Sequence, residues 1–155
     1  MESQALPVFS RLDADERAEV CIVGAGIAGL TTAYLLTRAG KSVVVLDDGP
    51  IVSGETERTT AHLVTALDER YCELERMHGE KGARLAAASH AEAINTIERI
   101  VGEERIDCDF ERVDGFLFNA PGQPADLLDR ELEAARRAGL TATAIVGRAP
   151  LASFH

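Results

Sequence analysis

The chain lacks long apolar runs, cysteine clusters and an apolar leader. No apolar stretch approaches the ~20 residues that a helix needs to cross a bilayer, so we expect a soluble protein without a membrane partner. Cys21, Cys72 and Cys108 are widely separated and form no CxxC or Cys/His cluster, which predicts neither a disulfide framework nor a metal site. The first residues contain no basic segment followed by an apolar one, so no secretory signal is predicted and a cytoplasmic location is expected.

Positive charge is also scarce. The 155 residues include 16 Lys and Arg against 26 Asp and Glu, which gives a formal net charge of −10. A protein of this charge repels phosphate backbones, so nucleic acid is not expected as a partner. A nucleotide cofactor remains compatible, because backbone N–H groups at a helix start can hold a pyrophosphate whatever the net charge.

The clearest pattern lies near the N-terminus, in "EVCIVGAGIAGLTTAYLLTRAGKSVVVLDDGP". Its short apolar run at residues 20–23 predicts a strand covered on both faces. Apolar residues at helical spacing then predict a helix over 27–39, which Gly40 ends. The β-branched run at 42–46 predicts a second buried strand. Strand, helix and strand together form a βαβ unit, which indicates an α/β fold of the Rossmann type.

Three glycines and one acid give this unit a predicted ligand. Gly24, Gly26 and Gly29 form GxGxxG between the first strand and the helix, where they allow a tight turn, a close approach of a pyrophosphate, and close packing of helix on strand. Asp47 ends the second strand, as expected of a partner for an adenosine ribose, and it disfavours the 2′-phosphate of NADP. For Asp48 we weigh a second ribose contact against a solvated surface charge.

The remaining sequence is less regular. Residues 1–17 predict a polar leader and residues 48–61 a loop. Helical patterns run from Asp68, a candidate N-cap, to residue 77 and again over 81–103 with Leu85 on the apolar stripe, separated by a break at His78 and Gly79. A β-hairpin is predicted over 109–120 around Asp114 and Gly115, then a helix over 124–138 and a strand over 141–146.

The glycine motif, the loop "GETERTTAHL" and the segment "ERVDGFLF" together resemble the N-terminal third of D-amino-acid-oxidase-like FAD-dependent oxidoreductases. The resemblance is strongest to members that carry a C-terminal Rieske iron-sulfur domain. No CxH motif paired with a later CxxH occurs here, so an iron-sulfur cluster is not predicted. The resemblance implies an incomplete fold, with a leader at 1–17, an FAD-binding unit and flavin loop at 18–65, a helical segment at 66–105, and the start of a substrate domain at 106–155.

The resemblance also implies a set of FAD contacts. The glycine turn, with Ala25 and Ile27 between its glycines, corresponds to the pyrophosphate site, and Asp47 stands where relatives commonly have Glu. In the loop, the residues that match the segment beside the pyrophosphate and flavin are Arg58, Thr59 and Thr60, while Glu57 replaces an expected Gly. His62 either contacts the isoalloxazine or is a hydrogen-bonded structural residue.

The implied function is oxidation of a small-molecule substrate by hydride transfer to FAD. Catalytic residues and the oligomeric state are not predicted, because no nucleophile, acid/base pair or triad can be placed from spacing. Two alternatives stay open: a non-catalytic module that binds NAD or ADP through the same βαβ unit, and an inactive fragment.

Overall fold

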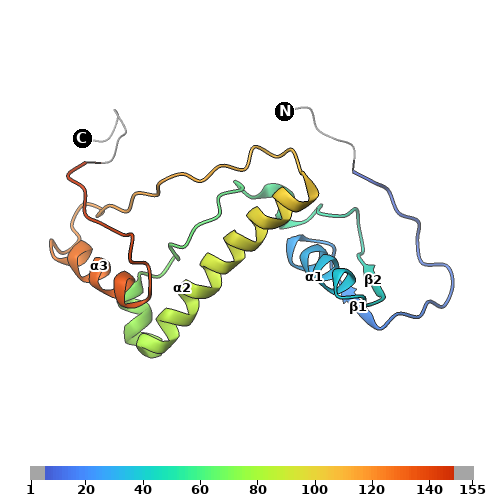
Figure 1. The fold of residues 1–155 in the computed structure, drawn as a ribbon, viewed down its shortest axis with the longest axis horizontal. Helices are drawn as coiled ribbons and strands as arrows, with labels where there is room; N and C mark the ends of the chain where they lie inside the picture. Colours follow the sequence, from blue (N-terminus) through green and yellow to red (C-terminus); the bar gives the residue numbers. More distant parts are fainter. Residues whose placement is uncertain (1–5, 149–155) are drawn as a thin grey trace. The chain divides into compact units, whose positions relative to one another are not determined.

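The computed structural model describes residues 6–148 of the chain. These residues belong to two compact units, Met1–His62 and Leu63–His155, which we describe separately (Figure 1). The first unit contains the glycine motif, and the second consists mainly of helices. None of the helices in residues 6–148 combines the length and the apolar character that crossing a bilayer requires.

The first unit is built around the predicted βαβ arrangement. Strand β1 (Val20–Val23) leads into helix α1 (Ile27–Arg38), and strand β2 (Val43–Leu46) returns parallel to β1. The register pairs Val20 with Val43 and Val23 with Leu46. Helix α1 ends at Arg38, Gly40 follows with a φ of 79° that favours glycine, and the N–H of Lys41 donates to the carbonyl of Leu36 at 3.0 Å. This part of the α/β prediction is confirmed.

The two strands are less covered than expected. We predicted strands buried on both faces, but Val23 is 85% exposed and β1 alternates between half-buried and exposed positions. The reason is that the sheet has only two strands in the described residues, and α1 packs against it. A hollow of about 420 Å³ beside the sheet is lined by Leu12, Glu16, Arg17, Ala18, Cys21, Val44 and Leu46.

Over residues 63–148, the second unit contains two helices, α2 (Tyr71–Glu104) and α3 (Leu127–Arg137). Gly79 interrupts α2 with a φ of 69° and a ψ of 168°, which confirms the predicted break. Helix α2 begins at Tyr71 rather than near Asp68, and its N-cap position is Arg70, so the prediction of an Asp68 cap was wrong. Small side chains make the contact between the helices, and the buried core residues are Tyr71, Ala83, Ala87, Ala134, Ala135 and Ala138.

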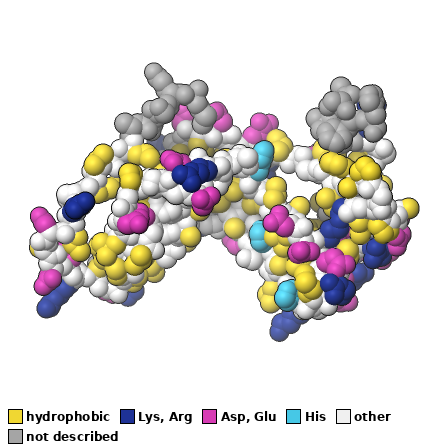
Figure 2. Space-filling view, turned by 180° about the vertical axis from the view of Figure 1, so that it is seen from behind, with side chains coloured by type: hydrophobic (Ala, Val, Ile, Leu, Met, Phe, Trp, Pro, Cys, Tyr) yellow, Lys and Arg dark blue, Asp and Glu magenta, His cyan; other side chains and the backbone are white. Residues whose placement is uncertain are grey.

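One residue of the predicted apolar stripe, Leu85, is not buried in the core. Leu85 is 61% exposed, whereas Ala83 and Ala87 are buried. An alanine pair lets two helices approach closely, so the buried face of α2 is defined by small residues and not by the larger leucine. Figure 2 shows hydrophobic side chains across the face that it draws.

The predicted hairpin over 109–120 does not form. A two-residue hairpin turn of the favoured type needs positive φ at both central positions, and neither Asp114 nor Gly115 has one. Instead, the guanidinium of Arg112 binds the carboxylate of Glu98 at 2.6 Å and the side-chain oxygen of Asn95 at 2.8 Å. These contacts tie the segment to α2 without strand pairing.

The predicted strand over 141–146 is also wrong. The N–H of Thr143 donates to the carbonyl of Leu140 at 3.2 Å, which makes a turn at this point. The carbonyl of Thr143 accepts two hydrogen bonds from the guanidinium of Arg136, at 3.2 Å and 3.0 Å. A backbone carbonyl used in this way is not available to a sheet ladder, so the β-branched run stays irregular. The end of the predicted substrate segment, residues 149–155, lies outside the described residues.

Candidate functional site

The turn between β1 and α1 places backbone donors at the start of a helix. Gly24 has a φ of 102°, which a residue with a side chain rarely adopts, and its N–H donates to the carbonyl of Leu46 at 2.7 Å. Gly26 is the N-cap of α1 and has no side chain with which to cap it. The first N–H groups of α1 therefore need acceptors from elsewhere in the chain or from a ligand.

At Gly26 and Gly29, neighbouring atoms leave little room for a side chain. A Cβ added to Gly29 would overlap the carbonyl oxygen of Gly24 and lie 3.3 Å from the side chain of Ile22. This is the close packing of helix and strand that the motif predicts. A Cβ on Gly26 would lie 3.1 Å from the hydroxyl oxygen of Thr56. The side of Gly26 on which another residue would carry its Cβ therefore faces the hydroxyl group of Thr56.

Asp47 lies beside the glycine turn, although 22 residues separate it from Ala25. One carboxylate oxygen of Asp47 accepts from the N–H of Ala25 at 2.5 Å, and the other accepts from the N–H of Gly49 at 3.0 Å. These two backbone donors, that of Ala25 first, lower the pKa of the Asp47 carboxyl. The acid is therefore charged and fixed beside the turn. Asp48 is exposed, and its assignment to a ribose stays a prediction.

Sequence reasoning missed Thr56. This residue lies in the short 3-10 helix η1 (Glu55–Arg58), inside the segment expected to be loop. Its hydroxyl oxygen accepts from the N–H of Ile27, the first residue of α1, at 3.1 Å. Thr56 thus caps a helix that begins 29 residues earlier, and local cap spacing could not reveal it. Threonine is a preferred capping residue type, and that was the only available signal.

The loop that carries Thr56 is bound to the turn by its backbone. The N–H of Val52 donates to the carbonyl of Ala25 at 3.0 Å, and the N–H of Glu57 donates to the carbonyl of Val52 at 3.2 Å. Val52 has a φ of 55°, which is rare for a β-branched residue. A strained residue of this kind persists only where its surroundings hold it, and such residues concentrate at functional sites.

The other predicted loop contacts do not reach the glycine turn. In the described residues, the hydrogen bonds and ion pairs of Arg58, Thr59, Thr60 and His62 are all made within residues 55–62. Arg58 lies 3.6 Å from Glu55 in an exposed ion pair, and the ring Nδ1 of His62 lies 3.0 Å from the Thr60 hydroxyl oxygen. Their assignment to FAD therefore remains a prediction.

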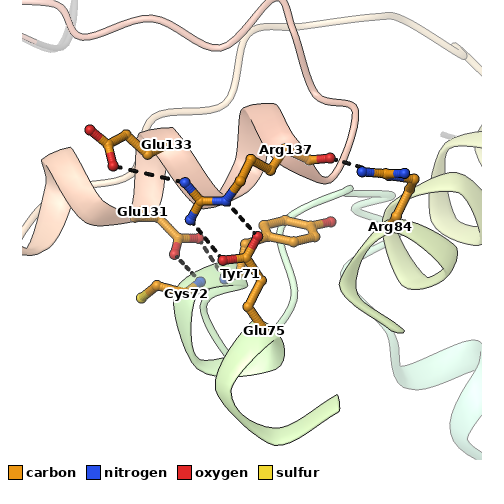
Figure 3. Close-up of polar contacts among 7 residues, drawn as sticks. All are labelled: Tyr71, Cys72, Glu75, Arg84, Glu131, Glu133 and Arg137. Atoms are coloured by element: carbon orange, nitrogen blue, oxygen red, sulfur yellow. Dashed lines mark hydrogen bonds and ion pairs between the residues drawn. The ribbon is translucent and has the colours of Figure 1, made fainter. Parts of the chain in front are cut away.

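The second unit has a polar cluster of its own, in which Glu131 is buried and Arg137 is exposed (Figure 3). The carboxylate of Glu131 accepts from the N–H groups of Tyr71 at 2.8 Å and Cys72 at 3.0 Å, so a side chain of α3 caps the start of α2. Arg137 binds Glu75 through two nitrogens, at 3.0 Å and 2.8 Å. Each of these polar groups has a hydrogen-bond or ion-pair partner within the cluster, which is typical of a cluster that stabilises the fold.

Burial, followed by the interaction with Glu131, raises the pKa of the Cys72 thiol. A raised pKa keeps the thiol protonated, so Cys72 is not set up as a nucleophile. Over residues 6–148, no group of three or more His, Cys, Asp and Glu side chains is placed to hold a metal ion. The glycine turn, Asp47 and Thr56 are therefore the best candidate site of the first unit.

Comparison with known proteins identifies the family of the chain. The family profile of FAD dependent oxidoreductases (DAO) matches residues 19–154. YhfW of Bacillus subtilis, named as a candidate Rieske 2Fe-2S iron-sulfur protein, is 36% identical over 138 residues, which cover 89% of this chain and 27% of that protein. The probable oxidoreductase OrdL of Haemophilus influenzae is 28% identical over 131 residues, or 84% of this chain and 30% of OrdL.

A third relative is the gamma-glutamylputrescine oxidoreductase of Escherichia coli, which is 31% identical over 102 residues, covering 66% of this chain and 24% of that enzyme. No solved structure matches the chain significantly. The chain spans less than a third of the length of each of these relatives. Because the family profile covers nearly all of it, the chain belongs to the DAO family of FAD-dependent oxidoreductases.

Proposed function

We propose that this chain supplies the FAD-binding part of an oxidoreductase that acts on a small-molecule substrate. The observation that carries the proposal is the position of Asp47 against Ala25, inside the GxGxxG turn of a chain that matches an FAD-dependent family. When bound, FAD would supply the redox chemistry by accepting a hydride at its flavin ring. The proposal also includes two statements about the whole protein: that it is an oxidoreductase, and that its substrate is a small molecule.

The residues of the turn fit a dinucleotide. A pyrophosphate requires a backbone without a Cβ at its closest approach, and Gly26 offers this at the positive end of α1. The carboxylate of Asp47 is an acceptor-only group at neutral pH, as a ribose hydroxyl requires. Asp47 would hold the ribose through its carboxylate, and the start of α1 would hold the pyrophosphate. Arg58, Thr59, Thr60 and His62 remain candidates for contacts further along FAD.

The proposal is tested by titrating the purified chain with FAD and following the quenching of flavin fluorescence. We expect saturable binding to the unmodified chain. Gly26→Val would place a side chain in the path of the pyrophosphate, so FAD affinity should fall at least about tenfold, equivalent to ~1.4 kcal/mol. Gly54→Val is the matched control, because a Cβ at Gly54 meets no atom within 4 Å.

Two results would count against the proposal. Equal FAD affinity in Gly26→Val and in the unmodified chain would show that the turn is not the binding site. Tighter binding of NAD than of FAD, measured by calorimetry on the same preparation, would favour a non-catalytic nucleotide module. Circular dichroism of each variant shows whether a loss of affinity reflects the site or the fold.

A further inference from the structure

We infer that Glu19 is a positioning residue for the candidate site, because it fixes the register of β2 against β1 and thereby places Asp47 beside the glycine turn. This inference rests on the proposed function, since Asp47 is the proposed ribose ligand. Glu19 lies just before β1, at the end of the strands opposite to the site. It is assigned from its hydrogen bonds with Ser42, the residue just before β2.

The first step is that the apolar residues of the two strands do not define their register. Strand β1 reads VCIV and strand β2 reads VVVL, and every residue of β2 is half-buried. A register is strongly specified where only one face of a strand is buried, whereas both faces of β2 are apolar and partly covered. A slip of β2 by one residue would still pair apolar residues with apolar residues. Contacts at the ends of the strands therefore select the register.

The second step is a reciprocal contact where both strands start. The N–H of Glu19 donates to the hydroxyl oxygen of Ser42 at 3.0 Å, and the N–H of Ser42 donates to one carboxylate oxygen of Glu19 at 3.0 Å. The other carboxylate oxygen accepts from the ammonium of Lys41 at 3.0 Å. The N–H of Ser42, followed by this ammonium, lowers the pKa of the Glu19 carboxyl, so the acceptor is charged. Both bonds between Glu19 and Ser42 require these residues to lie opposite each other, so they select one register.

The third step links this contact to the site. Asp47 directly follows β2, so its position along the sheet depends on the register of that strand. A slip of one residue would move Asp47 by ~3.3 Å along β1 and would turn its side chain to the other face of the sheet. The hydrogen bond from the N–H of Ala25 to the Asp47 carboxylate does not survive a displacement of this size. Glu19 thus acts on the site through β2, without contact with the ligand.

The test is a double-mutant cycle on FAD affinity, measured by the quenching of flavin fluorescence in Glu19→Ala, Asp47→Asn and the double variant. Asp47→Asn removes a charged acceptor of the ribose and should weaken FAD binding by about tenfold. Glu19→Ala should weaken it by about threefold to tenfold, because Asp47 is then not held beside Ala25. In the Asp47→Asn background, Glu19→Ala should change the affinity by less than about twofold, since the carboxylate that Glu19 positions is already gone.

Lys41→Ala is the matched control, because it removes only an exposed ion pair with Glu19 and should stay within about twofold of the unmodified chain. If Glu19→Ala weakened FAD binding equally in both backgrounds, Glu19 would only stabilise the fold and the inference would be overturned. If Glu19→Ala does not fold, Ser42→Ala takes its place in the cycle, because it removes the acceptor of the Glu19 N–H and leaves the carboxylate. The same non-additive pattern is then expected with a smaller loss.

A second measurement separates this inference from the proposed function. Hydrogen exchange of the Ala25 amide, followed by NMR without ligand, should be faster in Glu19→Ala than in the unmodified chain and unchanged in Lys41→Ala. Absence of FAD binding to the unmodified chain would overturn the proposed function, and this exchange would still decide whether Glu19 places Asp47. An Ala25 amide that exchanged at the same rate in Glu19→Ala and in the unmodified chain would overturn the inference, even where FAD binds.

Discussion

The two units of this chain are stabilised in different ways. In the second unit, α2 and α3 bury an alanine-rich core together with Tyr71, and a carboxylate of α3 caps α2. In the first unit, Ala25 is the sole buried residue among residues 6–62. Its glycine turn donates hydrogen bonds to the side chains of Asp47 and Thr56 and accepts one from the N–H of Val52.

This difference shows where each unit obtains its stability. Burial of apolar surface is the main favourable term in folding, whereas a typical hydrogen bond contributes only about 0.5–1.5 kcal/mol. The second unit has both terms, and the first depends mainly on polar contacts that converge on one turn. A unit of this kind gains stability from anything that binds its folded form, so the proposed FAD would also stabilise the fold.

The largest effect is expected from Glu131, whose side chain is buried and bonded to two backbone N–H groups. Glu131→Ala leaves the donors of Tyr71 and Cys72 without their acceptor, which should destabilise the second unit by about 2–4 kcal/mol. Hydrogen exchange measured on peptides of each unit should show faster exchange in α2 and no change in residues 19–47. Glu133→Ala is the matched control, because this exposed acid lies 3.9 Å from Arg137 and should contribute less than about 0.5 kcal/mol.

If Glu131→Ala exchanged as slowly as the unmodified chain, the cap would be unimportant and the alanine core alone would hold the helices. An intermediate result for Glu131→Gln would identify the charge as part of the effect. One amide oxygen of glutamine can still accept, but the negative charge at the positive end of α2 is lost.

A smaller effect is expected in the first unit, from Gly29→Ala. The added Cβ would overlap the carbonyl oxygen of Gly24, so α1 must move away from the turn at a cost of about 1–3 kcal/mol. Faster hydrogen exchange in β1 and α1, with α3 unchanged, would show this. The matched control is Gly54→Ala, where a Cβ meets nothing within 4 Å and the exchange rates should stay as they are. Equal exchange in both variants would mean that helix and strand are not closely packed.

Local sequence patterns predicted the parts of the molecule that depend on neighbouring residues. The βαβ unit follows from periodicity and glycine spacing, and the break at Gly79 follows from a glycine within a helical pattern. Asp47 was predicted as part of the site because its distance from the glycines is fixed by one helix and one strand. The structure places its carboxylate against the N–H of Ala25 in the glycine turn, and its role as a ribose ligand stays a prediction.

Patterns that depend on distant partners were not predicted. The hairpin over 109–120 has strand-like residues, but a strand forms only where another strand pairs with it, and Arg112 binds α2 instead. Thr56 and Glu131 cap helices whose first residues lie 29 and 60 positions away. A capping rule reads only adjacent positions, so neither residue could be assigned from spacing.

The smallest effect is expected from acid, acting through Asp47. Its folded-state pKa is lowered by the N–H of Ala25, so the carboxylate contributes stability above its unfolded pKa of about 3.9 and loses that contribution as pH falls through the lower folded value. In Asp47→Asn, the backbone amides of β1 and α1 should therefore exchange faster than in the unmodified chain at neutral pH.

Because the intrinsic rate of hydrogen exchange itself changes with pH, the variant and the unmodified chain are compared at the same pH. Their difference should shrink steadily below about pH 4, whereas Asp13→Asn, at an exposed leader position, should leave the exchange unchanged. A difference between Asp47→Asn and the unmodified chain that stayed constant down to pH 2 would show that the carboxylate charge does not hold the turn.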